Sequence, residues 1–333
     1  MLSCFKALQI HSIFINLCSL SQKKLRLIYL VKLKSFVNCR WQKLLISRIR
    51  ARPLAAEALK EEIMRLGTSS PLKHSSPEEW AENQLQLGCT TVVFPVQSNE
   101  SEEKIIAYKE AAEKARLTIA EVGIWRNALA ADSAERKANM DYCVNQLRMA
   151  DFLNARCAVN VAGTFGPRWD GGYKENFSKE AWKKTVSMVQ EIIDRANVKK
   201  TYFTLEPMPW MIPTSPQEYI RLLEDVDRDR FAVHMDIINM INSAERYFNA
   251  KEFIDECAEV LGNRIRSCHI KDVHLNEKYT FQLVECGPGD GEFPLQYYVQ
   301  KMNEIDSQMP VILEHLDSDE QYIKYMNYLK KTL

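Results

Sequence analysis

Short apolar runs rich in β-branched residues alternate with longer amphipathic segments, and this alternation constrains the fold more than any other feature of the sequence. Eight such runs predict strands: Arg65–Ser69, Thr90–Phe94, Thr118–Val122, Cys157–Val161, Thr201–Leu205, Phe231–Asp236, Ile265–Ile270 and Val311–Glu314. Continuously apolar strands of this kind are buried on both faces, as in a parallel sheet. The segments between them predict helices: Pro77–Leu87, Glu100–Arg116, Ala134–Ala150, Lys179–Ala196, Pro216–Val226 and Lys251–Leu261.

Capping residues support these helices. Ser76, Ser178 and Ser215 each precede a proline or an acidic first turn, and Gly88 and Gly262 stand where two helices should end. Eight strand–helix units predict a single (β/α)8 TIM barrel in the α/β class. An open doubly wound sheet is disfavoured, because no glycine-rich nucleotide loop follows the first predicted strand.

The N-terminal region differs in charge from the rest of the chain. Residues 1–56 contain eleven Lys or Arg and no acid, so we expect residues 1–63 to be a basic N-terminal extension and 64–333 to be the barrel. The extension has three interpretations: a mis-assigned start, an organellar targeting segment or an added helical element. Its longest uncharged stretch, 7–22, is too short and polar to span a bilayer, so no membrane partner is expected.

The net charge and the cysteines bear on the expected partner and location of the protein. Beyond residue 56, 33 basic groups face 44 acidic groups, a net of −11, which would repel a polyanion and excludes nucleic acid as the expected partner. The nine cysteines form no CxxC pair, which indicates reduced thiols and a cytoplasmic location.

Polar residues at the ends of four predicted strands are the candidates for chemistry, because active sites of such barrels lie at the carboxyl ends of the strands, here called the mouth. These residues are Glu206, Asp236, His269 and Glu314. A buried carboxylate in this position costs free energy unless it is compensated. Three carboxylates and one imidazole therefore predict one divalent metal ion, with Mn²⁺ favoured and Mg²⁺, Co²⁺ or Zn²⁺ as options.

The same residues carry a family resemblance. With the motifs His269-Ile270-Lys271-Asp272 and Ile312-Leu313-Glu314-His315-Leu316, the chain resembles the xylose isomerase-like TIM barrel superfamily, and within it the sugar phosphate isomerase/epimerase group. The resemblance implies that all four residues bind one metal ion. It also implies that Glu206 and Glu314 are catalytic, acting as acid and base on opposite faces of a sugar. Proton abstraction beside a carbonyl needs such a base and a Lewis acid.

The expected substrate-binding residues surround that site. They are Glu121, Trp125, Arg126, Trp210, Asn239, Lys271 and His274. The tryptophans could equally plug the barrel, Glu121 could orient another side chain, and His274 could be a solvated loop residue. Ketose 3-epimerases carry a histidine where this chain has Asn239 and an arginine where it has Leu275, so a free ketohexose is not expected. The loop 285–293 lacks the ending of a phosphate-binding loop, which favours an unphosphorylated sugar.

These observations predict a metal-dependent sugar isomerase or epimerase that works through an enediolate. Two alternatives remain: a metal-dependent lyase or dehydratase acting on a 3-oxo-glycoside or an inosose-like polyol, and a non-catalytic sugar-binding barrel. The three-zinc endonucleases of the superfamily are excluded, because the ends of the second and third predicted strands supply no histidine. A homo-oligomer is compatible with the resemblance.

Overall fold

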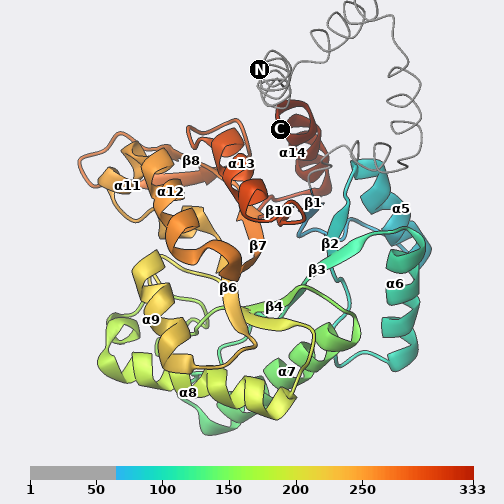
Figure 1. Cartoon of the computed structure of the whole chain (residues 1–333), viewed down its shortest axis with the longest axis horizontal. Coiled ribbons are helices and arrows are strands. Elements are labelled where there is room, and N and C mark those ends of the chain that lie inside the picture. Colours follow the sequence, from blue (N-terminus) through green and yellow to red (C-terminus); the bar gives the residue numbers. More distant parts are fainter. Residues whose placement is uncertain (1–64) are drawn as a thin grey trace, which may run out of the picture. The chain divides into compact units, whose positions relative to one another are not determined.

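Eight parallel strands form the core of the protein in the computed structural model, which describes residues 65–333. The strands are β1 (Arg65–Thr68), β2 (Thr91–Val93), β3 (Thr118–Gly123), β4 (Cys157–Asn160), β5 (Tyr202–Leu205), β6 (Phe231–Met235), β7 (Ile265–Ile270) and β10 (Pro310–Leu313). Their order in the sheet, β1-β10-β7-β6-β5-β4-β3-β2, follows the chain around a barrel (Figure 1). All eight predicted strands are present, each end within one residue of its predicted position, and the predicted TIM barrel is confirmed.

Close approach of the first and second strands closes the barrel. The backbone N–H of Thr90 donates to the carbonyl of Leu66 at 2.9 Å. A Cβ on Gly67 would lie 2.4 Å from the carbonyl oxygen of Thr91, so only glycine lets the two backbones come this close. The glycine of β1 is therefore a requirement of closure.

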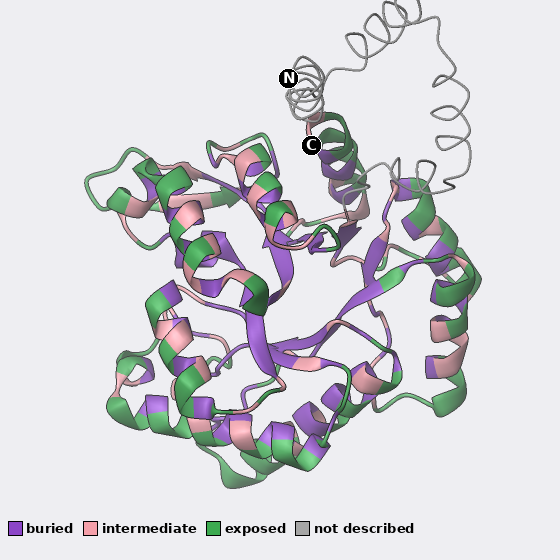
Figure 2. Ribbon diagram, viewed as in Figure 1, coloured by how far each residue is buried: buried purple, intermediate pink, exposed green. Residues whose placement is uncertain are grey.

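Helices surround the strands (Figure 1). They are α5 (Pro77–Leu87), α6 (Glu102–Lys114), α7 (Ser133–Phe152), α8 (Lys179–Ala196), α9 (Pro216–Val226), α12 (Ala250–Leu261), α13 (Leu295–Ile305) and α14 (Asp319–Thr332). The predicted serine caps are confirmed, because Ser76, Ser178 and Ser215 each accept a backbone N–H from the first turn. The strands are buried while the outer faces of the helices are exposed, which places the core within and around the barrel (Figure 2).

The segment between β7 and α13, which includes the expected loop 285–293, has more regular structure than expected. It contains an antiparallel hairpin of β8 (Asp272–Leu275) and β9 (Leu283–Cys286). Asp272 ties the following loop to this hairpin, since its carboxylate accepts the N–H groups of Gly289, Gly291 and Phe293. The hairpin was missed because its strands are only half apolar and the segment is rich in turn residues.

Short elements complete the description: η1 (Lys174–Phe177), α10 (Ile237–Met240), α11 (Ala244–Phe248) and η2 (Gly262–Arg264). The six cysteines within residues 65–333 are free, as expected. None of the described helices is long and apolar enough to cross a membrane. The predicted extension 1–63 lies outside the described residues.

Candidate metal centre

The four predicted metal ligands meet at the mouth of the barrel. Glu206 follows β5, Asp236 follows β6, His269 lies in β7 and Glu314 follows β10. All four side chains are buried. One potential ligand atom from each residue lies within 4.8 Å of those of the other three.

This spacing fits a single divalent cation. Ligands on opposite sides of one ion at about 2.1–2.4 Å lie roughly 4.2–4.8 Å apart. Nδ1 of His269 lies 2.6 Å from Oε2 of Glu314 and 3.3 Å from Oε1 of Glu206, so this nitrogen faces the carboxylates. Three carboxylates with one imidazole suit Mn²⁺, Mg²⁺, Co²⁺ or Zn²⁺. The types of ligand atom and their spacing are therefore both consistent with one divalent cation.

Lys271 lies inside the same cluster. Its Nζ donates to Oδ2 of Asp236 at 2.6 Å and to Oε1 of Glu314 at 2.7 Å, and its side chain is only 1% exposed. A buried ammonium needs such partners, because removing a charge from water is costly. Lys271 thus supplies a fixed positive charge directly beside two of the candidate metal ligands.

The pKa values of Asp236 and Glu314 are shifted because several charged side chains lie close together in the cluster. Burial and the neighbouring Glu314 and Glu206 raise the pKa of Asp236 well above its usual range, although Lys271 opposes this shift. Burial also opposes ionisation of Glu314, but His269 and Lys271 outweigh it and hold the pKa of Glu314 well below its usual range. Three carboxylates in so small a space therefore require positive charge.

A second polar layer lies one step deeper in the barrel. Glu121 of β3 accepts hydrogen bonds from Nε2 of His269 at 3.2 Å, from Nε2 of His234 at 3.2 Å and from the hydroxyl of Ser267. All of these side chains are buried. Burial opposes ionisation of Glu121, but His269 and His234 outweigh it and hold its pKa far below the usual range. Glu121 is thus a buried carboxylate beneath the four-residue cluster.

Two of the other predicted site residues, besides Glu121, join the cluster. Lys271 does so as described, and Nδ2 of Asn239 donates to Oε1 of Glu206 at 3.1 Å. The backbone N–H of Asn239 also donates to Oδ1 of Asp236 at 3.1 Å, so that Asp236 caps the short helix α10. Asn239 therefore fixes the orientation of two candidate ligands.

The remaining predicted residues make other contacts. The Arg126 guanidinium lies over the ring of Tyr142 in α7, 4.6 Å from the centroid, and donates to the carbonyl of Trp125. Trp210 donates through Nε1 to the carbonyl of Asp170 at 2.7 Å. His274 is a half-buried residue of β8. No bond from these side chains to the four ligands is recorded within residues 65–333.

Trp125 has an unusual backbone. Its φ is 52°, in the left-handed region that non-glycine residues rarely occupy. A Cβ on Gly123 would lie 2.4 Å from Nε1 of Trp125, so the indole lies against the end of β3. The structure thus places Trp125 at the mouth, with no recorded bond to the cluster among the described residues.

Several residues near the cluster were not singled out from the sequence. His315 and Glu285 form a hydrogen bond of 2.9 Å at the mouth, and Oε2 of Glu285 lies 4.0 Å from Nζ of Lys271. His234 and Ser267 stand two residues before Asp236 and His269. The period of two along a strand would have placed them on the same inward face as those ligands.

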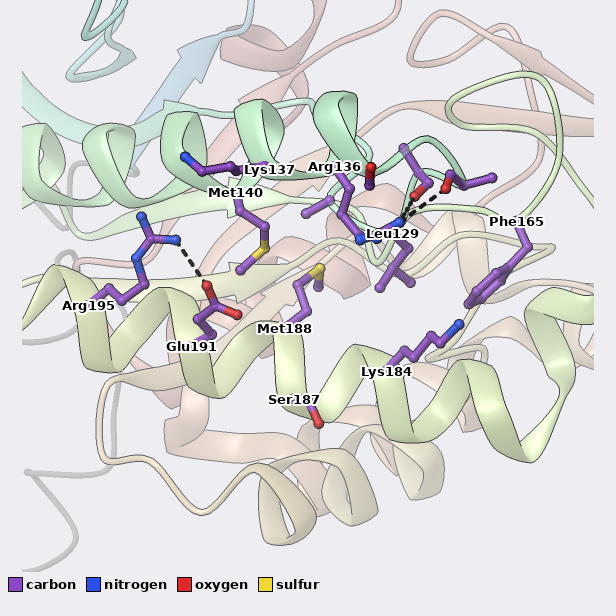
Figure 3. A pocket seen from close by; sticks show the side chains of 14 residues that line it. Leu129, Arg136, Lys137, Met140, Phe165, Lys184, Ser187, Met188, Glu191 and Arg195 are labelled. Atoms are coloured by element: carbon purple, nitrogen blue, oxygen red, sulfur yellow. Dashed lines mark hydrogen bonds and ion pairs between the residues drawn. The ribbon is translucent and has the colours of Figure 1, made fainter.

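A cavity of about 730 Å³ lies away from this cluster, between α7 and α8. Met140 and Met188 point into it from the two helices, and Phe165 and Lys184 stand at one end (Figure 3). The cations around it already have partners: Arg136 donates to the carbonyls of Ala130 and Ala131. The cavity therefore offers no unpaired charge that would point to a particular ligand.

Comparison with known proteins agrees with the observed TIM-barrel fold. The model of the family described as xylose isomerase-like TIM barrel matches residues 82–332. No curated protein matches the chain. Among solved structures, a xylose isomerase-like TIM barrel protein from Mycobacterium smegmatis in complex with magnesium is 14% identical, with a TM-score of 0.58 over 80% of this chain and 95% of that one.

Two further structures carry named activities. A D-allulose 3-epimerase from Methylomonas sp. is 15% identical, with a TM-score of 0.60 over 81% of this chain and 98% of that one. A probable 3-DHS dehydratase involved in petrobactin synthesis, from Bacillus anthracis, is 14% identical, with a TM-score of 0.62 over 81% and 100%. At these identities the likenesses show the fold.

Proposed function

The chain belongs to the xylose isomerase-like TIM barrel family, and from this premise we propose that it is a divalent-metal-dependent isomerase or epimerase of a sugar or sugar derivative. One observation carries the proposal. Glu206, Asp236, His269 and Glu314 come from the ends of four strands, and each offers a buried ligand atom within 4.8 Å of the others. The sugar 3-epimerases among the structural neighbours are consistent with it.

The two glutamates would move the proton. Glu206 and Glu314 follow β5 and β10, which are separated in the sheet by β6 and β7. A carboxylate on one side of a sugar can remove the hydrogen beside a carbonyl, and a second on the other side can return it to the opposite face. Asn239 would hold Glu206 in place through its 3.1 Å hydrogen bond.

Glu206, Asp236, His269 and Glu314 would hold the metal ion, with Mn²⁺ as the first choice. When bound, it would supply Lewis-acid stabilisation of the developing negative oxygens. Lys271 would add a fixed positive charge beside Asp236 and Glu314, two of the residues that would hold the ion. One lysine and one divalent ion would then offset the charges of the three carboxylate ligands, and Glu121 adds a negative charge beneath them. A site without excess positive charge favours an uncharged sugar over a phosphorylated one.

The proposal is tested by metal analysis of the purified protein, followed by incubation with a panel of unphosphorylated sugars and 3-oxo-glycosides in deuterated buffer. An isomerase or epimerase returns an isomeric sugar with one solvent deuterium at the reacting carbon. We expect Glu206→Gln and Glu314→Gln each to lower kcat by about a hundredfold to ten-thousandfold, because general acid–base groups contribute on the order of 10²–10⁴ each. Wild-type turnover that persists in chelator would contradict the proposal.

The alternatives give different products. A lyase or dehydratase acting from the same base would release water or an aglycone and return no isomer. A non-catalytic sugar-binding barrel would bind sugar without exchanging deuterium, and both glutamine variants would keep that affinity. Glu285→Gln is the matched control: it removes a carboxylate at the mouth that lies 4.0 Å from Lys271 but outside the four-residue cluster.

A further inference from the structure

We propose that Glu121, held in place by His234 and Ser267, is a positioning residue that turns Nδ1 of His269 toward the metal ion. The inference rests on the proposed metal site and assigns a role to three buried residues that the proposed reaction does not use. Glu121 belongs to β3, His234 to β6 and Ser267 to β7, so three strands converge on one carboxylate.

The direction of the hydrogen bonds carries the argument. An ionised carboxylate only accepts, so the hydrogen in the 3.2 Å contact between His269 and Glu121 lies on Nε2 of His269. When a metal ion displaces the hydrogen on Nδ1, the neutral imidazole that keeps its hydrogen on Nε2 presents a lone pair at Nδ1. That nitrogen is the one that faces Glu314 and Glu206, at 2.6 Å and 3.3 Å. Glu121 therefore selects the ring orientation and tautomer that a metal ion needs.

Burial shows that this arrangement is costly. Glu121 is 1% exposed, and among the described residues its recorded partners are two histidines and a serine rather than a lysine or arginine. A carboxylate in such a place costs free energy that an apolar side chain would not. A purely structural barrel interior would be better served by valine or leucine. The retained charge points to a role at His269.

The unpaired nitrogen of His234 is an independent observation. Nδ1 of His234 is buried and has no hydrogen-bond partner among the described residues, while Nε2 donates to Oε1 of Glu121. Among the described residues, the hydrogen bond of the His234 ring is therefore made to Glu121. The two imidazoles cross edge to face with centroids 4.1 Å apart, so His234 also packs against His269. His234 restrains both the carboxylate and the ring that the carboxylate orients.

A second ion held by Glu121, His234 and His269 is the competing interpretation, because these residues also offer ligand atoms within 4.8 Å of one another. Two features favour the hydrogen-bonded arrangement. Ser267 already donates to Oε1 of Glu121. A second ion would also require His269 to bridge two metals through both ring nitrogens. The stoichiometry of metal binding separates the two interpretations.

The experiment titrates the full-length apo protein with Mn²⁺ or Co²⁺ alone and compares wild type with Glu121→Gln. We expect one ion per chain, bound about 10–100-fold more weakly by the variant, as is typical for loss of a carboxylate behind a histidine ligand. If the glutamine oxygen faces His269, the basicity of the ring falls. If the glutamine amide faces it, the hydrogen moves to Nδ1 and blocks the metal. The absorption spectrum of the Co²⁺ form should change as well.

Two further variants, Ser267→Ala and His234→Phe, separate the effect of Glu121 on metal affinity from a general loss of structure. Ser267→Ala removes one donor from Glu121 but leaves its bond to His269, and it should change the affinity by less than about threefold. His234→Phe frees Glu121 to move and should weaken binding by an intermediate factor. It serves as the second variant if Glu121→Gln does not fold.

Two results would overturn the inference. The first is wild-type affinity with an unchanged Co²⁺ spectrum in Glu121→Gln and His234→Phe. The second is two ions per wild-type chain, of which Glu121→Gln loses one and keeps the other unchanged. A wild-type protein that binds no divalent ion would instead overturn the proposed metal site, and with it this inference.

Discussion

Lys271 donates from Nζ to Oδ2 of Asp236 at 2.6 Å, with both side chains 1% exposed. The same ammonium contacts Glu314 at 2.7 Å. Burial lowers the pKa of Lys271, but the two carboxylates outweigh this and hold the pKa well above its usual range. The lysine therefore stabilises the closely spaced carboxylates before any metal ion binds.

Replacing Lys271 should expose this dependence. We expect Lys271→Met to lower the free energy of unfolding by about 3 kcal/mol in chelator, because it leaves buried carboxylates without their cation. Mn²⁺ should stabilise the variant more than the wild type, because it supplies the missing charge. At about 100 times Kd, a ligand adds roughly 2.7 kcal/mol. Urea unfolding with chelator and with Mn²⁺ measures both effects.

Lys301→Met is the control for this measurement. Lys301 forms a surface pair with Asp255 at 2.9 Å and is 27% exposed, so its loss should cost less than about 1 kcal/mol and should not respond to Mn²⁺. Equal losses for the two lysine variants, or a Mn²⁺ response no larger in Lys271→Met than in wild type, would contradict the prediction.

Tyr219 joins two strands next to the site. Its buried hydroxyl accepts the backbone N–H of Leu205 at 3.3 Å and that of His234 at 3.2 Å, where the register of β6 and β7 shifts. It also donates to the carbonyl of Leu205. Tyr219→Phe should therefore cost about 1–3 kcal/mol of unfolding free energy, because buried backbone groups lose their partner. The exposed Tyr173→Phe should cost almost nothing, and equal costs would refute this explanation.

The contacts of Asp151 predict that its contribution to the unfolding free energy depends on pH. Burial opposes its ionisation, but the backbone N–H groups of Lys199, Lys200 and Thr201 outweigh burial and lower the pKa of Asp151. A group with a lowered native pKa stabilises the fold above its unfolded pKa, about 3.9, and loses that contribution as the pH falls. The stability gap between wild type and Asp151→Asn should therefore shrink from pH 7 to pH 3.

A difference in unfolding free energy between wild type and Asp151→Asn that stays constant from pH 7 to pH 3 would contradict this prediction. It would show that the three backbone N–H contacts do not lower the native pKa of Asp151 below its unfolded value.

Barrel closure can be tested at Gly67. A Cβ there would lie 2.4 Å from the carbonyl oxygen of Thr91, a backbone atom that cannot move aside without separating β1 from β2. We expect Gly67→Ala to lower the free energy of unfolding by about 2 kcal/mol or more, in the range of overpacked positions. Gly172→Ala, whose Cβ would lie 3.3 Å from the Trp210 side chain, should cost less. Thermal unfolding of the two variants measures this difference, and equal losses would contradict the prediction.

Local patterns in the sequence were enough to predict the barrel. A strand such as Phe231–Met235 is apolar along its length because both faces are buried, and a helix such as Lys179–Ala196 begins at a capping serine. Both signals reside in adjacent residues. Because parallel strands of a barrel end at one mouth, the residues that follow them could be expected to meet there. Glu206 and Asp236 were found in this way.

Contacts between distant strands could be decided only by the tertiary structure. The sequence places Lys271 just beyond His269, but only the fold shows its Nζ between Asp236 and Glu314. For Arg126, predicted from the sequence as a substrate-binding residue, only the fold shows that its guanidinium lies over the ring of Tyr142. The physical reason is that strand stagger and side-chain rotamers determine which polar atoms come within 3 Å, and neither is encoded in the period of two or 3.6 that marks an element.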